Sequence, residues 1–224
     1  MCEKKIKLCV CDWDGTIVDS VEKITECKRF LAKKYSLEPP SKALVKEVLG
    51  TKFEKALARC FPTASKKLLN DIATDFHSLM QLPEYQSIPF NNAIAVLKDL
   101  QGKQGIILAI ATSKARAELD KSLDYIGITD LFDYVCCSEE HQSKPDPEML
   151  NYIMKQAGVT PSQTIMIGDT TVDMEFALNA KVTPIGVTFG AHSNEKLVQF
   201  NPLGILSSWS ELPGILKLEN KCIT

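Results

Sequence analysis

Two aspartates follow the first apolar segment of the chain at a spacing of two residues. Asp12 and Asp14 lie in the segment Asp-Trp-Asp-Gly-Thr, directly after residues 7–11. Side chains alternate along an extended strand, so carboxylates two residues apart point to the same side as the strand ends. Such a pair can exchange protons or bind a cation, whereas Asp-Gly by itself is also common in polar turns.

A second acidic pair follows residues 164–167, which are also apolar. Asp169 and Asp173 are four residues apart, the spacing of one face of the helix expected over residues 171–179. Both could serve only that helix, Asp169 as its N-cap and Asp173 as an acid in its first turn. Four carboxylates at neighbouring strand ends would nevertheless repel one another without a cation, and Mg²⁺ prefers hard oxygen ligands of this kind.

A hydroxyl group and an ammonium group follow two further apolar segments. Thr112 comes directly after residues 106–111, and Lys144 comes after residues 134–137. Each has a simpler interpretation, as a helix N-cap or a solvated lysine. Lys114 could be a neighbour of the phosphate or metal site, but the pattern favours a lysine at a helix start. Together with the aspartates, the Thr112 hydroxyl, the N–H groups that follow it and the Lys144 ammonium match the needs of a phosphoryl group.

The apolar segments that carry these residues alternate with helical patterns. Short continuous apolar runs are typical of parallel strands covered on both faces, and they occupy residues 7–11, 106–111, 134–137, 164–167 and 183–187. Apolar residues at helical spacing lie between them, at residues 114–126, 147–157 and 171–179. This alternation predicts an α/β fold with a doubly wound parallel sheet.

A long segment separates the first two predicted strands. A crossover with its helix needs only about a dozen residues or more, whereas apolar residues recur at helical spacing from residue 21 to residue 79. We therefore expect a helical subdomain, residues 18–87, here called the insert, and an α/β core made of residues 1–17 and 88–224. Open α/β sheets bind ligands at the carboxyl ends of their strands, so we expect the insert above the predicted site.

Composition and charge narrow the classes of partner. The 26 Lys and Arg residues nearly balance the 28 Asp and Glu residues, which does not favour a nucleic-acid or membrane partner. No apolar run approaches the roughly 18 residues that span a bilayer. The apolar stretch of residues 8–11 is too short for a secretory signal. The eight cysteines contain no Cys-x-x-Cys pattern, so we expect reduced thiols and a cytoplasmic protein.

These motifs, in this order, resemble those of the haloacid dehalogenase superfamily, in particular its phosphoglycolate phosphatase-like branch. The resemblance rests on residues 12–16, Thr112, Lys144, Asp169 and Asp173, and the insert lies where that branch keeps its cap. It implies a Rossmann-like core with a mobile cap. It also implies a Mg²⁺-dependent phosphatase that hydrolyses a small phosphorylated metabolite, such as phosphoglycolate, through an aspartyl-phosphate intermediate.

The resemblance also implies roles for individual residues. Asp12 is similar to the family's nucleophile, and Asp14 is similar to its general acid and base. Thr112, the Ser113 N–H group and Lys144 are similar to the groups that bind the phosphoryl oxygens.

The same resemblance implies a set of metal ligands. Mg²⁺ would be held by the Asp12 side chain, the Asp14 carbonyl oxygen and Asp169. Asp173 would lie at or just behind these ligands.

Other functions remain open from the sequence. A β-phosphoglucomutase-like phosphosugar mutase would use the same core residues, and so would a pyrophosphatase or a nucleotide phosphatase of the same branch. A non-catalytic binding module is the alternative outside enzymes, but it would have no need for Asp14. The oligomeric state, monomer or dimer, stays open, as does a redox role for Cys11, which adjoins Asp12.

Overall fold

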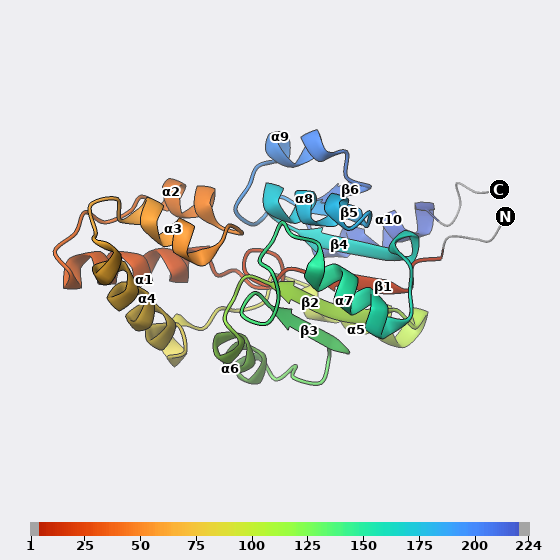
Figure 1. Ribbon diagram of the computed structural model, residues 1–224. Coiled ribbons are helices and arrows are strands. Elements are labelled where there is room, and N and C mark those ends of the chain that lie inside the picture. The colour runs from red at the N-terminus through yellow and green to blue at the C-terminus, as the bar shows by residue number, and fades with distance from the viewer. Residues whose placement is uncertain (1–4, 220–224) are drawn as a thin grey trace.

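The apolar segments form a six-stranded parallel sheet (Figure 1). The protein is described here by a computed structural model that covers residues 5–219. The strands are β1 (Leu8–Cys11), β2 (Ile107–Thr112), β3 (Tyr134–Cys137), β4 (Thr164–Gly168), β5 (Thr183–Val187) and β6 (Gly204–Leu206). They pair in the order β3-β2-β1-β4-β5-β6. The predicted α/β fold with a doubly wound parallel sheet is confirmed, and β6 is a strand that the sequence did not predict.

Alternate side chains of each strand enter one of two apolar layers. In β1, Cys9 and Cys11 face the layer that contains α5 (Ala93–Gln104), α6 (Arg116–Ile126) and α10 (Leu212–Glu219). Leu8 and Val10 face the layer that contains α7 (Glu148–Ala157) and α8 (Thr171–Asn179). The sheet is therefore buried on both faces, which explains why its strands are continuously apolar.

Shorter helical segments occur in both the core and the insert. They are α9 (Asn194–Leu197) and the 3₁₀ turns η1 (Pro83–Tyr85), η2 (Pro161–Gln163), η3 (Val198–Phe200) and η4 (Trp209–Glu211). Within residues 5–219, no helix is both long enough and apolar enough to cross a membrane. The six cysteines of this part of the chain are buried and unpaired.

Helices of the insert lie beyond the carboxyl ends of the strands (Figure 1). They are α1 (Val21–Lys34), α2 (Lys42–Val48), α3 (Phe53–Cys60) and α4 (Lys66–Leu79). Their buried apolar side chains, among them Leu31, Leu57 and Ile72, form a cluster separate from the two layers of the sheet. The insert thus packs around its own interior.

The two connections between the insert and the core run side by side. Val18 and Pro89 form an antiparallel bridge. The Asp19 N–H donates to the Ile88 carbonyl oxygen at 3.0 Å, and the Phe90 N–H donates to the Ile17 carbonyl oxygen at 2.9 Å. The chain therefore leaves the core and returns to it through one hydrogen-bonded pair of segments.

Candidate active site

Three aspartates meet at the carboxyl ends of the two central strands. Asp12 follows β1, Asp169 follows β4, and Asp173 lies in the first turn of α8. Because Cys11 of β1 lies opposite Ile167 of β4, the two strands end side by side. One oxygen from each of the three buried carboxylates lies within 4.8 Å of the others, an arrangement that could hold a metal ion.

Asp173 also takes part in the N-terminal cap of α8. The N-cap of α8 is Thr170, and the Asp173 Oδ2 atom accepts hydrogen bonds from the Thr170 N–H at 3.1 Å and the Thr170 hydroxyl at 2.6 Å. Asp169, interpreted above as a possible N-cap, does not cap this helix. Its carboxylate instead accepts from the Ala191 N–H at 2.7 Å and the Thr16 hydroxyl at 3.1 Å.

Lys144 supplies positive charge to this cluster. Its Nζ atom lies 2.7 Å from Asp12 Oδ1 and 2.7 Å from Asp173 Oδ1, and its side chain is fully buried. Burial lowers the pKa of Lys144, but the charges of the two aspartates outweigh it and hold the pKa above its usual value. Lys144 is therefore a charged partner of both carboxylates.

The cluster carries more negative than positive charge when its acids are ionised. Burial raises the pKa of Asp12 from 3.8 to about 7, against the opposing effect of Lys144. Burial also raises the pKa of Asp169, and the charges of Asp173 and Asp12 raise it further. Three carboxylates thus share one ammonium group, and a cation or protons must supply the missing positive charge.

We expect the metal-free protein to lose stability as the pH rises from about 4 to about 7. In this range the folded protein, with the Asp12 pKa at about 7, binds more protons than the unfolded chain, in which aspartate titrates near 3.8. The stabilising contribution of Asp12 is therefore fully present below the unfolded pKa and is lost as the pH rises through about 7. The raised pKa values of Asp169 and His77 act in the same direction, and the lowered pKa of His192 acts in the opposite direction. Thermal unfolding in a chelator should show a Tm lower by about 5 °C or more at pH 8 than at pH 5.

Added Mg²⁺ provides the control for this prediction. If it replaces protons as the counter-charge, it raises the Tm at pH 8 more than at pH 5. A metal-free Tm that rises between pH 5 and pH 8 would contradict the assigned charge balance.

Asp14 points away from the three clustered aspartates. Its carboxylate oxygens lie 3.3 and 3.4 Å from Lys114 Nζ, and that ammonium lies 3.6 Å from a Glu118 oxygen. The expectation that four carboxylates gather at one place is therefore wrong: three gather, and the fourth pairs with a lysine. The next residue, Gly15, has φ +84°, and an added Cβ there would lie 2.3 Å from an Asp169 oxygen, so this position requires glycine.

Lys114 lies beside the site, which is the less favoured of its two interpretations from the sequence. Its side chain is only 5% exposed, and it lies between Asp14 and Glu118 instead of in solvent. The spacing of four residues between Lys114 and Glu118 was the available signal, because such a pair shares one helix face. Lys114 is thus positioned to hold the Asp14 carboxylate in place.

Thr112 is the last residue of β2 and Ser113 follows it, and Ser113 contacts the insert. The Thr112 hydroxyl accepts a hydrogen bond from the Lys114 N–H at 3.1 Å. The Ser113 hydroxyl donates to the Gly50 carbonyl oxygen of the insert at 3.5 Å. Both residues line the same cavity as Asp12 and Asp14.

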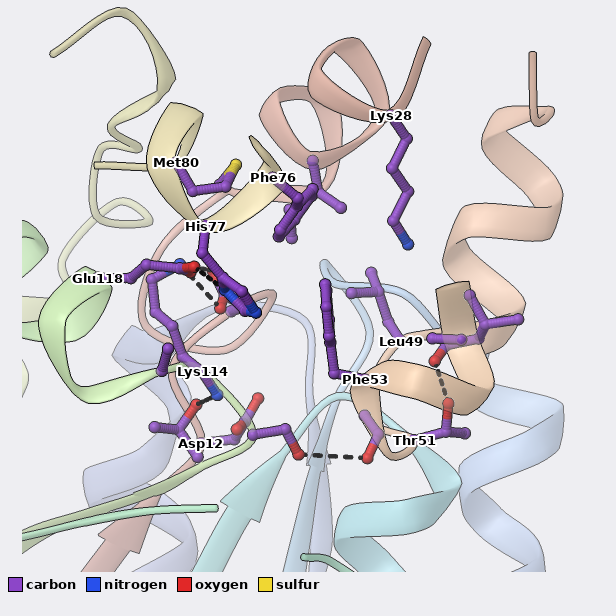
Figure 2. Close-up of a pocket in the computed structure, with 18 residues that line it drawn as sticks. Asp12, Lys28, Leu49, Thr51, Phe53, Phe76, His77, Met80, Lys114 and Glu118 are labelled. Carbon is purple, nitrogen blue, oxygen red and sulfur yellow. Dashed lines mark hydrogen bonds and ion pairs between the residues drawn. The ribbon is translucent and has the colours of Figure 1, made fainter. Parts of the chain in front are cut away.

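This cavity lies between the core and the insert (Figure 2). Its core wall is polar and consists of Asp12, Asp14, Thr112, Ser113, Lys114, Ala115 and Glu118. Its other wall is mostly apolar and consists of Ile24, Lys28, Val48, Leu49, Gly50, Thr51, Phe53, Ala56, Phe76, His77 and Met80. Lys144, Asp169 and Asp173 do not line this cavity. Asp12 belongs both to the lining of the cavity and to the acid cluster.

Polar contacts join the insert to the core around the cavity. His77 Nδ1 lies 2.5 Å from Glu118 Oε1, and this hydrogen bond raises the His77 pKa. Lys46 donates to the Gly190 carbonyl oxygen at 3.1 Å. An added Cβ on Gly50 would lie 2.6 Å from the Thr170 hydroxyl oxygen, so the loop backbone packs directly against the core.

Comparison with known proteins gives matches along nearly the whole chain. A family model described as haloacid dehalogenase-like hydrolase matches residues 9–187. The "Probable phosphatase IndB" of Dickeya dadantii is 29% identical over 97% of this chain and 98% of its own. The phosphoglycolate phosphatase of Vibrio cholerae is 27% identical over 89% of this chain and 92% of its own. A haloacid dehalogenase-like family hydrolase of Streptococcus pneumoniae, 22% identical, has the same fold, with a TM-score of 0.82 over 93% of this chain and 97% of that one.

Proposed function

Because the chain belongs to the haloacid dehalogenase-like hydrolase family, we propose that it is a Mg²⁺-dependent phosphatase that hydrolyses small phosphate monoesters through an aspartyl-phosphate. The prediction from the sequence that the protein is a hydrolase of this family is confirmed. Relatives that match most of the chain are named phosphatases. The observation that carries the proposal is the position of Asp12. It joins the polar wall of the cavity to a cluster of acids with excess negative charge.

The donor set of the cluster fits a hard divalent cation. Three carboxylates and one ammonium group leave two negative charges, and all the ligand atoms on offer are oxygens. The Asp12 side chain, the Asp14 carbonyl oxygen and Asp169 would hold Mg²⁺, with Asp173 at or just behind them. The ion, when bound, supplies charge neutralisation for the phosphoryl group.

Asp12 and Asp14 divide the covalent chemistry between them. An Asp12 carboxylate oxygen attacks phosphorus, the bond from phosphorus to the ester oxygen breaks, and Asp14 gives a proton to the leaving alcohol. Asp14 then takes a proton from water, which attacks the aspartyl-phosphate and releases phosphate. The contact with Lys114 fixes the Asp14 carboxylate beside the cavity for both steps.

The remaining predicted residues bind the phosphoryl oxygens. The Thr112 hydroxyl and the Ser113 N–H group lie on the core wall of the cavity. An ammonium group has three N–H donors, and Lys144 uses two of them on Asp12 and Asp173. Its third donor is available to a phosphoryl oxygen, where negative charge must be balanced in the transition state.

The insert acts as the cap of this active site. It supplies the apolar wall of the cavity, and polar contacts join it to the core. A cap that closes over bound substrate excludes bulk water during phosphoryl transfer and opens to release products. We propose that the cap comprises residues 18–87 and that the catalytic core comprises residues 1–17 and 88–224. The expectation of a cytoplasmic enzyme rests on the sequence.

Phosphate release from a panel of esters tests the proposal. The panel contains phosphoglycolate, sugar phosphates, nucleotides and pyrophosphate, each with and without Mg²⁺. We expect release of inorganic phosphate from at least one small monoester, and we expect EDTA to lower that rate by about 10³-fold or more. Isomerisation of a sugar phosphate without phosphate release would instead indicate a mutase. A folded protein that is inactive on the whole panel would favour a binding module.

A further inference from the structure

Lys28 of α1 is a buried lysine without an acidic partner. The residue is 3% exposed. Within residues 5–219 its ammonium group forms no ion pair, and its hydrogen-bond partner is the Cys60 thiol, with Nζ and Sγ 3.6 Å apart. Burial lowers the pKa of Lys28, which reflects the cost of keeping an ammonium group away from water. A thiol is a weak acceptor, so this charge lacks compensation.

The other buried lysines of the described chain differ from Lys28 in this respect. Lys114 contacts the carboxylates of Asp14 and Glu118, and Lys144 contacts those of Asp12 and Asp173. Each is thus compensated by two acids of the protein. Lys28 is the buried lysine in this part of the chain that no acidic side chain contacts, so an anionic ligand could pair with it.

The same cavity contains Lys28 and the catalytic aspartates. Figure 2 shows the Lys28 side chain extending from α1 into the part of the cavity where Leu49 and Phe53 lie, whereas Asp12 and Lys114 are at the opposite end. Most of the wall on the insert side is apolar. A ligand that reaches both ends therefore contacts the catalytic aspartates at one end, apolar side chains in the middle and the Lys28 ammonium group at the other end.

We propose that Lys28 is a specificity-determining residue that binds a carboxylate at the organic end of the substrate. This inference rests on the proposed function, which places the phosphoryl group at Asp12. The substrate class is a phosphate monoester whose apolar carbon chain ends in a carboxylate. One ammonium group balances the single charge of a carboxylate, whereas a second phosphate, with a charge of about −1.5 to −2, would keep an unbalanced charge among apolar side chains.

Matched pairs of esters test this inference. Phosphoglycolate, 3-phosphooxypropanoate and 4-phosphooxybutanoate carry a terminal carboxylate, and ethyl, propyl and butyl phosphate are their uncharged counterparts. For at least one pair we expect a kcat/KM ratio of about 10 to 100 in favour of the carboxylate, the size of a hydrogen bond to a charged group. In Lys28→Met the ratio is expected to fall to about one or below.

Two further variants make the result specific to Lys28. Lys33→Met removes an exposed lysine of the same helix and should keep the wild-type ratio. Lys28→Gln retains a polar side chain without the charge and should lose the preference, as Lys28→Met does. Thermal unfolding of both Lys28 variants checks that they remain folded, which is expected because an uncompensated buried charge is removed.

The outcomes separate this inference from the proposed function. Asp12-dependent hydrolysis of esters without any preference for the carboxylate members would overturn the role of Lys28 and keep the phosphatase. A preference that survives in both Lys28 variants would also overturn it. Absence of hydrolysis across these esters and the wider panel would overturn both proposals.

Discussion

Replacement of Asp12 by asparagine is expected to lower kcat by about 10⁴-fold or more, as removal of a nucleophile does. An amide oxygen is a poor nucleophile, and among the carboxylates that line the cavity (Asp12, Asp14 and Glu118), Asp12 is the one that belongs to the acid cluster. The protein should stay folded, because the change removes one of three mutually repelling carboxylates and Lys144 keeps Asp173 as its partner. Steady-state phosphate release and thermal unfolding measure the two effects.

Asp14→Asn is the matched comparison for that variant. It alters an acid of the same cavity but leaves the Asp12 carboxylate in place. If Asp14 activates water in the second step, this variant accumulates protein that carries a covalent phosphoryl group, whereas Asp12→Asn does not. Mass spectrometry of acid-quenched protein distinguishes the two.

Two results would contradict these assignments. Near-normal turnover by Asp12→Asn would remove Asp12 as the nucleophile. A defect of Asp14→Asn that is confined to weaker Mg²⁺ binding would remove Asp14 as the acid and base.

Replacement of Lys144 by methionine is expected to lower the free energy of unfolding of the metal-free protein by about 3–5 kcal/mol at pH 8. Its ammonium group is fully buried and contacts Asp12 and Asp173, so its removal leaves the clustered carboxylates without a positive neighbour. Urea unfolding measures the loss. The variant should also lower kcat strongly, because a charge that would balance the phosphoryl oxygens is absent.

Mg²⁺ and a surface lysine provide the controls for Lys144→Met. Saturating Mg²⁺ should recover part of the lost stability, since it supplies positive charge to the same carboxylates. Lys155→Met removes an exposed lysine of α7 and should change stability by about 0.5 kcal/mol or less. A loss below about 1 kcal/mol for Lys144→Met would show that the aspartates do not depend on this ammonium group.

The meeting of Asp12 and Asp169 could be predicted because it depends on strands. Continuous apolar runs indicate a parallel sheet, and the carboxyl ends of parallel strands lie at one edge. Side chains that follow such strands therefore come together whatever their rotamers. The short strand β6 was missed because its three residues, Gly204–Leu206, carry too little pattern.

The partners of individual charged side chains could not be predicted in this way. Asp14 pairs with Lys114 instead of joining the acid cluster, and Lys114 reaches it through a long flexible side chain. Lys28 lines the cavity only because the insert packs above the core, a contact between segments far apart in sequence. The alternation and helical spacing of apolar residues predict which face of a strand or helix is buried. They do not specify which side chains from distant segments contact one another.

The pairing of the two connecting segments restricts how the insert can move. Because Val18 and Pro89 are bridged and their neighbours are hydrogen-bonded, both connections must turn together, as the two halves of one hinge. Sliding or twisting would break these bonds, whereas a swing about a single axis preserves them. In the opening of the cap that we propose, the contacts of His77 with Glu118 and of Lys46 with Gly190 have to break. We therefore expect the rate of product release to depend on polar contacts between the insert and the core that lie outside the catalytic residues.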